Sequence, residues 1–148
     1  MSEDRKQIRQ IAIAALARRE HSRVELHRKL TSKGFHIDTV ESELDRLASE
    51  RLQDDSRFAE AYIRYRAGHG YGPVKIGIEL SQRGVGDALS THVMEQLEVD
   101  WFENSQLAWE KKFGVRATDY KERAKQARFL QHRGFTGEQI SVLLNQEH

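Results

Sequence analysis

The hexamer LSQRGV, residues 80–85, decides the fold, because two close copies of it stand elsewhere in the chain. The copies are LTSKGF at 30–35 and LQHRGF at 130–135, so the three hexamers start 50 residues apart. Each contains a leucine, two polar residues, a lysine or arginine, a glycine and an apolar residue. A shared pattern at equal spacing predicts three copies of one structural unit in this chain of 148 residues.

The residues around each hexamer predict a helix, a glycine turn and a second helix. Apolar residues at helical spacing precede the turn, at Val24, Leu26 and Leu30, then Val74, Ile76 and Leu80, then Ala124, Ala127 and Leu130. Others follow it, at Val40, Leu44 and Leu47, then Val93, Met94 and Leu97, then Ile140, Leu143 and Leu144. The glycine between them suits the left-handed conformation that ends a helix. The basic residue before it suits the negative end of the helix dipole.

Helix-start signals agree with this reading. Residues Ser22 to Glu25 form the S-x-x-E pattern of a capping box. The same logic applies, with other capping residues, at Asp38–Glu41, Asp119–Glu122 and Thr136–Gln139. Each pair of helices is also preceded by a further helical stretch, over Arg5–Arg19, Ser56–Ala67 and Trp101–Phe113.

The sequence therefore predicts an all-α fold of about nine helices. These helices form three tandem three-helix repeats, which we expect at residues 1–53, 54–99 and 100–148. Helical repeats of this kind stack into an elongated, curved molecule, and we expect a continuous core to run through the stack.

The stretch GHGYGPVK, residues 68–75, first resembles a loop that cradles phosphate. Such a loop needs a strand before it and, in a P-loop, a serine or threonine after the lysine. Here a helix precedes the glycines, and Ile76 follows Lys75. The glycines are better explained as the end of one helix, and Gly72-Pro73 as the start of the next with proline at its first position. A glycine turn also allows another backbone to approach closely.

Composition narrows the class of protein. The net charge is +1, so any basic surface must be local and balanced by acid elsewhere. The chain has no cysteine, which excludes disulfides and thiol chemistry and favours a reducing compartment. Its charged N-terminal stretch lacks the apolar segment of a signal peptide, and no apolar run is long enough to span a bilayer. We expect a soluble, cytoplasmic monomer.

No catalytic or cofactor site is visible in the sequence. The seven histidines form no metal-ligand spacing, and we expect them at the surface or in turns. Asp54 and Asp55 stand just before a helix, where capping explains them better than metal binding or acid–base work. The chain also lacks the G-x-S-x-G pattern of a nucleophile elbow. We expect no enzyme activity, no cofactor and no metal.

The most informative charged segment runs from residue 56 to residue 75. It carries a single acid, Glu60, against the cations Arg57, Arg64, Arg66 and Lys75. Interleaved with these cations are Tyr62, Tyr65 and Tyr71. One interpretation places the aromatic rings in the core and the arginines in solvent. The other is a basic stripe that contacts phosphate or an acidic protein surface, for which arginine and tyrosine are well suited.

A second basic run, KERAKQAR, spans residues 121–128. Lys121, Lys125 and Arg128 fall at i, i+4 and i+7, on what we expect to be the outer face of a helix. Such a run is either a solvated surface or a partner contact. Between the two basic regions, Trp101 and Phe102 are expected to pack the second repeat on the third.

Residues 54–85, DDSRFAEAYIRYRAGHGYGPVKIGIELSQRGV, resemble the signature of the RecX family, regulators of the RecA recombinase. The stretches ARREHSRVELHRKLTSKGF at 17–35 and RFLQHRGFTGEQI at 128–140 are similar to the flanking units of that family. The resemblance covers nearly the whole chain. One departure is Gln53, which stands where an apolar residue, usually leucine, is expected before Asp54-Asp55.

The resemblance implies a function that composition alone does not. RecX-like proteins have no catalytic activity; they bind RecA and its filament on single-stranded DNA, and they typically limit filament extension, strand exchange and co-protease activity. Some members instead support recombination. The resemblance leaves open inhibition or support, end-capping or groove binding, the contact residues, the angles between repeats and the oligomeric state.

Within this frame the candidate contacts with RecA or DNA are Arg57, Arg64, Arg66, Tyr71, Lys75, Lys121, Lys125 and Arg128. Gly70, Gly72 and Pro73 are expected to set the turn that positions Arg64, Arg66, Tyr71 and Lys75. The alternative function is an autonomous DNA-binding protein, because paired helices with a glycine turn resemble a helix-turn-helix.

Overall fold

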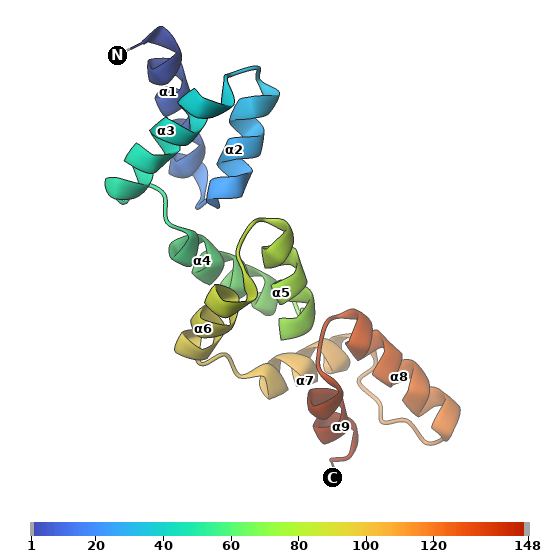
Figure 1. Cartoon of the computed structure of the whole chain (residues 1–148). Helices are drawn as coiled ribbons and strands as arrows, with labels where there is room; N and C mark the ends of the chain where they lie inside the picture. Colours follow the sequence, from blue (N-terminus) through green and yellow to red (C-terminus); the bar gives the residue numbers. More distant parts are fainter. Residues whose placement is uncertain (1, 147–148) are drawn as a thin grey trace.

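The computed structural model describes residues 2–146, which contain nine α-helices and no β-strand. In chain order they are α1 (Glu3–Arg18), α2 (Arg23–Ser32), α3 (Ile37–Ser49), α4 (Asp55–Gly68), α5 (Pro73–Gln82), α6 (Asp87–Leu97), α7 (Trp101–Lys112), α8 (Tyr120–His132) and α9 (Gly137–Leu144). Figure 1 shows three groups of three helices that follow one another along an elongated molecule. The solvent-accessible surface is 9191 Å². A compact protein of this length would expose about 7,800 Å². The all-α, three-repeat prediction is confirmed.

Each repeat is a small bundle with its own core. The first helix packs on the third, and the second helix closes the bundle, as with α4, α6 and α5 in repeat 2. Leu30, Leu80 and Leu130, the leucines that begin the hexamers, are fully buried in the three separate cores. The expectation of one continuous core is therefore wrong. The only side chain common to two of these clusters in the described part of the chain is Trp101, which packs against both core 2 and core 3.

The hexamer glycines behave as predicted. Gly34, Gly84 and Gly134 have φ angles of +92°, +83° and +96°, which end α2, α5 and α8 in the left-handed conformation. The left-handed conformation is strained for any residue with a Cβ atom. This explains why a glycine stands at the same place in each of the three hexamers.

The helix starts agree with the sequence in most cases. Ser22 and Thr136 form reciprocal capping boxes with Glu25 and Gln139. Asp119 caps α8 by accepting from the backbone N–H of Glu122.

The expected cap at Asp38 is wrong. His36 occupies the N-cap of α3, and its Nδ1 accepts from the backbone N–H of Asp38 at 3.2 Å. Apolar Ile37 lies between them as the first residue of the helix. The imidazole nitrogen thus replaces the usual hydroxyl or carboxylate, which sequence rules for caps do not anticipate.

The turn between repeats 1 and 2 explains the unusual Gln53. Its side chain is buried, and Nε2 donates to the carbonyl of His21 at 3.3 Å and to the carboxylate of Asp55 at 2.9 Å. The same Asp55 oxygen accepts from the backbone N–H of Arg23 at 2.9 Å. Asp54 caps α4, as predicted. Gln53 thus connects the two repeats by hydrogen bonds where an apolar side chain would only fill space.

A buried carboxylate holds repeat 1 together. Glu43 of α3 is fully buried, and its carboxylate lies 3.1 Å from Nη1 of Arg9, 3.5 Å from Nε of Arg5 and 3.7 Å from Nη1 of Arg46. Since a buried charge is costly unless it is paired, these contacts orient α1 on α3.

The repeats are joined by turns rather than by broad helix faces. A Cβ atom on Gly84 would lie 2.1 Å from a methyl group of Val24, and one on Gly134 would lie 2.3 Å from Cβ of Lys75. In both cases the glycine turn of one repeat rests on the first turn of the second helix of the preceding repeat. The same interface is therefore used twice, with a small contact area that leaves the molecule extended.

Candidate partner-binding surface

The arginines predicted to form a basic stripe on repeat 2 are each matched by an acid. Arg57 lies 3.4 Å from Glu20 of the first repeat, and Arg64 lies 3.0 Å from Glu60 one turn earlier on α4. Both pairs are substantially exposed, so each contributes little to stability. Their positive charge is nevertheless offset, which lowers the attraction of this stretch for an anion.

Arg66 makes a stronger, internal pair. Its guanidinium donates two hydrogen bonds to the carboxylate of Glu79 on α5, at 2.9 and 2.7 Å, and the hydroxyl of Tyr62 donates to the same carboxylate at 3.0 Å. Burial pushes the pKa of Glu79 upward, but the hydrogen bonds from Arg66 and Tyr62 outweigh it and hold the pKa below its ordinary value. This bidentate pair fixes α4 against α5.

Glu79→Gln should test this pair. We expect the free energy of unfolding at pH 7 to fall by about 1–3 kcal/mol, because a charged, hydrogen-bonded partner of Arg66 is removed. The pKa of Glu79 is depressed in the folded state, so its contribution is present above the unfolded pKa of about 4.3 and is lost as the pH falls through the folded value. Urea unfolding at pH 7, 5 and 3 should show the difference from wild type shrinking with acid. A difference that stays constant would contradict the ion-pair role.

Tyr71 lies at the junction of repeats 2 and 3. The guanidinium of Arg66 stands 3.7 Å from its ring centroid, and that of Arg133 stands 4.6 Å away. The ammonium group of Lys75 lies 5.4 Å from the same centroid. Three cations therefore gather around one ring, a favourable arrangement for each of them. The structure thus brings three of the predicted contacts together and adds Arg133, while Arg57 and Arg64 lie apart.

The glycine-rich stretch is where repeat 3 docks. The backbone N–H of Gly72 donates to the carbonyl of Arg133 at 2.7 Å, and that of Val74 donates to the carbonyl of Gly134 at 2.9 Å. A Cβ atom on Gly72 would lie 2.5 Å from the backbone of Gly134 and Phe135. Helix α5 has no side-chain cap, and the turn after α8 supplies carbonyls to the N-cap residue Gly72 and to Val74 of its first turn instead. The backbone that approaches these glycines belongs to the same chain.

Repeat 3 carries positive charge without ion pairs. In residues 2–146, all ion pairs within 4.0 Å involve only repeats 1 and 2. We define the basic face of repeat 3 as Lys111, Lys112, Lys121, Lys125, Arg128 and Arg133. All except the half-buried Arg133 are exposed. Glu110, Asp119 and Glu122 stand beside these cations in the sequence but make no direct ion pair with them. The cations are therefore available to an acidic partner.

Part of the basic face lines a cleft between repeats 2 and 3, which we call the junction cleft. Its volume is about 380 Å³. Its lining includes Lys111, Lys112 and Arg133, the ring of Phe129, the backbone of Gly68 and Gly70, and no carboxylate. Lys125 and Lys121 lie one and two turns before Phe129 on α8, so the positive charge continues from the cleft along this helix.

Exposed aromatic rings lie beside the same cleft. The side chain of Tyr65 is 63% exposed, and its ring lies against that of His69 at a tilt of 40°, with the ring centroids 4.4 Å apart. The interpretation that places Tyr65 in the core with Phe58 is therefore wrong, although Phe58 itself is buried. Cations beside exposed rings suit single-stranded nucleic acid as well as protein surfaces.

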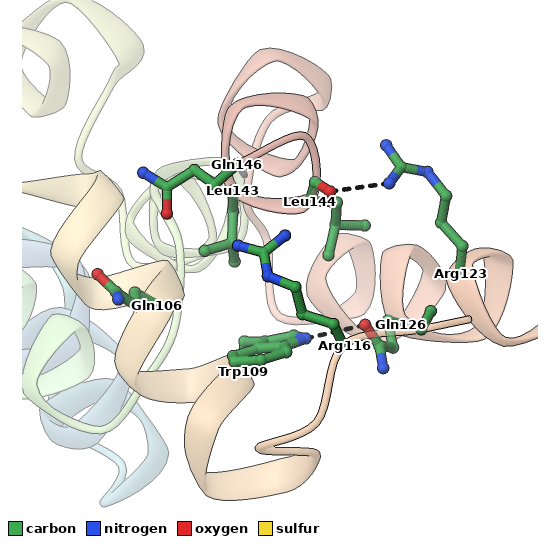
Figure 2. Close-up of a pocket in the computed structure, with 9 residues that line it drawn as sticks. Gln106, Trp109, Arg116, Arg123, Gln126, Leu143, Leu144 and Gln146 are labelled. Carbon is green, nitrogen blue, oxygen red and sulfur yellow. Dashed lines mark hydrogen bonds between the residues drawn. The ribbon is translucent and has the colours of Figure 1, made fainter. Parts of the chain in front are cut away.

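A smaller cavity inside repeat 3 has a structural role. Its volume is about 50 Å³, far below the few hundred Å³ of a typical ligand site. In Figure 2, Gln126 accepts from the indole N–H of Trp109 at 2.9 Å, and Arg123 donates to the carbonyl of Leu144 at 2.8 Å. Figure 2 also places the guanidinium of Arg116 between Trp109 and the end of α9. These two hydrogen bonds hold α7 and α9 against α8. Nε2 of Gln126 also donates to the carbonyl of Val115 at 3.0 Å, which holds the α7–α8 loop.

Sequence reasoning missed part of this surface. Lys111 and Lys112 are the last residues of α7, and Arg133 caps α8, so each had a local explanation as a helix-end cation. Only the packing of repeat 3 on Gly70 and Gly72 brings them to one cleft. Trp101 packs against both core 2 and core 3, as predicted. Phe102 packs against core 3 alone, so it does not join the two repeats.

Among residues 2–146, no three His, Asp or Glu side chains are grouped as metal ligands. None of the described helices combines the length and the apolar character needed to cross a membrane.

Comparison with known proteins gives consistent matches over the whole chain. Models of the first, second and third three-helix domains of RecX match residues 9–47, 54–94 and 98–144. A protein of Pseudomonas putida (strain GB-1) called Regulatory protein RecX is 48% identical over 139 residues, which cover 93% of this chain and 89% of the relative. Another of that name from Pseudomonas entomophila (strain L48) is 45% identical over 139 residues, covering 93% and 90%.

Solved structures share the fold. The crystal structure of RecX from Lactobacillus salivarius has a TM-score of 0.84 at 23% identity and covers 97% of this chain and 96% of that one. A second crystal structure, of a regulatory protein RecX, has a TM-score of 0.79 at 18% identity and covers 98% and 73%.

Proposed function

Because the chain belongs to the RecX family of regulatory proteins, we propose that it modulates the RecA recombinase, and specifically that it inhibits it. It binds RecA and its filament on single-stranded DNA, and so limits filament extension, strand exchange and co-protease activity. It acts as a cytoplasmic monomer by binding alone and needs no catalytic group. An elongated stack of repeats suits this role because it presents a long surface rather than a deep pocket.

The observation that carries the proposal is the basic face of repeat 3. A filament of protein on single-stranded DNA is a polyanion, and a surface of cations without acid partners gains most from contact with it. Lys121, Lys125 and Arg128 are exposed and have no ion pair within residues 2–146. They are the contacts we propose first, with Lys111 and Lys112 beside them.

The candidates on repeat 2 divide into two roles. Arg66 and Tyr71 are held by Glu79 and Arg133, so we propose that they position the junction cleft. Lys75 and the exposed, singly paired Arg57 and Arg64 are proposed as weaker contacts at its edge. Binding that engages Arg57 or Arg64 has to compete with their existing carboxylate partners.

Charge disfavours the alternative, an autonomous helix-turn-helix protein. In that motif the helix after the turn enters the major groove with its N-terminal residues against the bases. Here α3, α6 and α9 follow the turns, and their first turns carry Asp38, Asp87 and Glu138. Carboxylates at these positions would repel the phosphates that flank the groove. The exposed cations of the basic face of repeat 3 lie instead on α7 and α8.

A binding comparison separates these functions. We expect the labelled protein to bind preassembled filaments of RecA on single-stranded DNA much more tightly than naked single- or double-stranded DNA at the same salt concentration. Fluorescence anisotropy with each target at about 0.1 M salt would measure this. Equal or tighter binding to naked DNA would overturn the recombinase proposal and favour the DNA-binding one.

A further inference from the structure

The second helix of repeat 2 breaks the pattern of its siblings at one surface position. At matching points 50 residues apart stand Arg28, Ile78 and Arg128. Ile78 is 56% exposed, and one turn before it Val74 is 49% exposed. Helical spacing groups Val74 with Ile76 and Leu80, which are fully buried, but its own side chain lies at the surface. Ile78 therefore stands where the other two repeats have an arginine, and it forms an exposed apolar pair with Val74. Packing inside the fold does not explain this pair.

These side chains line a groove between α5 and α6. It consists of two adjoining hollows of about 430 and 490 Å³ that share Pro73, Val74, Thr91 and Met94. Gly77 lines the first hollow, and a Cβ atom built on it meets nothing within 4 Å. The missing side chain keeps the groove open, at a cost to helix α5 of about 1 kcal/mol relative to alanine.

The rim of the groove is acidic. The only charged residues among those that line the two hollows are Asp87, Glu95 and Glu98. All three are exposed, and none has an ion pair among residues 2–146. A groove with an apolar floor and an acidic rim is complementary to a partner that has an apolar surface flanked by positive charges.

We propose that this groove binds an amphipathic helix of another protein, with an apolar stripe and flanking lysines or arginines. Helix α5 has 10 residues and is therefore about 15 Å long, which matches about three turns of a bound helix. Apolar side chains at i, i+4 and i+7 of the partner would lie over Val74, Gly77 and Ile78, and its cations would face the acidic rim. A symmetric contact between two copies of this chain would instead bring the same acids together. The inference does not depend on the recombinase proposal, because the basic face belongs to repeat 3.

The test uses the full chain and a labelled peptide of about 14 residues, with leucines at helical spacing and lysines elsewhere. A peptide of the same pattern with glutamates in place of lysines is the charge control. Ile78→Arg installs the residue of the sibling repeats, and Gly77→Leu fills the groove. Val142→Arg makes the same kind of change at an apolar side chain of α9 that is 51% exposed.

We expect the lysine peptide to bind the wild type and the glutamate peptide to bind at least about tenfold more weakly. Ile78→Arg and Gly77→Leu should each lower the affinity for the lysine peptide by about tenfold, as loss of a central apolar anchor does. Val142→Arg should change it less than about twofold. Circular dichroism checks that both groove variants keep the wild-type helix content.

The proposal is overturned if both peptides bind equally, or if neither groove variant weakens binding. It is also overturned if sedimentation shows a wild-type dimer that Ile78→Arg dissociates, since a second copy would then occupy the groove.

Discussion

Replacing Gly72 by alanine is expected to separate repeat 3 from repeat 2. The added Cβ atom would lie 2.5 Å from three backbone atoms of Gly134 and Phe135, none of which can rotate away. The two turns would have to part, with loss of the backbone hydrogen bonds from Gly72 and Val74. We expect a loss of about 3 kcal/mol or more in the free energy of unfolding of repeat 3, from overpacking and from unsatisfied backbone groups.

Urea unfolding followed by tryptophan fluorescence would measure this effect, because Trp101 and Trp109 both lie in α7 of repeat 3. Gly77→Ala is the matched control on the same helix, since its Cβ atom meets open space. It should raise the stability by up to about 1 kcal/mol. If both variants unfolded at the wild-type urea concentration, the docking of the repeats through Gly72 would be contradicted.

Removing three cations from the basic face of repeat 3 is expected to weaken filament binding strongly. Lys111, Lys121 and Lys125 are exposed, and their side chains make no hydrogen bond or ion pair among residues 2–146, so alanine at these positions should leave the fold intact. For contacts with phosphate, affinity should fall on the order of 10- to 100-fold, and the slope of log K against log salt should become shallower by about 0.7 per lysine.

A matched variant controls for net charge. Lys6, Arg18 and Lys33 of repeat 1 are also exposed, and alanine at all three changes the charge by the same amount. This variant should bind filaments within about twofold of wild type. If the two triple variants lost affinity equally, net charge rather than the basic face would govern binding.

The fold could be predicted from the sequence because its signals are local. The left-handed glycines, the capping boxes at Ser22 and Thr136 and the proline at the start of α5 each act within one turn. Where the sequence-based predictions of the fold were wrong, the reasons are physical too. The cap at His36 uses an unusual acceptor, which cap rules do not anticipate. Helical spacing alone also cannot tell that Val74 faces solvent while Ile76 and Leu80 face the core.

The candidate surface could be predicted only in part. Lys121, Lys125 and Arg128 follow from helical spacing on a single helix. The neutralisation of Arg66 by Glu79 and of Arg57 by Glu20 depends on contacts between different helices, which spacing does not reveal. Arg133 reaches Tyr71 only because the two glycine turns interlock. Where charge remains after folding is therefore a property of the tertiary structure.

We propose that the chain restrains RecA through the basic face of repeat 3. The measurement is the single-stranded-DNA-dependent ATPase rate of RecA. It is made with rising amounts of the wild type and of the variant with alanine at Lys111, Lys121 and Lys125. We expect the wild type to lower the rate at amounts below that of RecA, and the variant to need on the order of tenfold more for the same effect. A rate that stays constant at every ratio, or equal inhibition by both proteins, would contradict it.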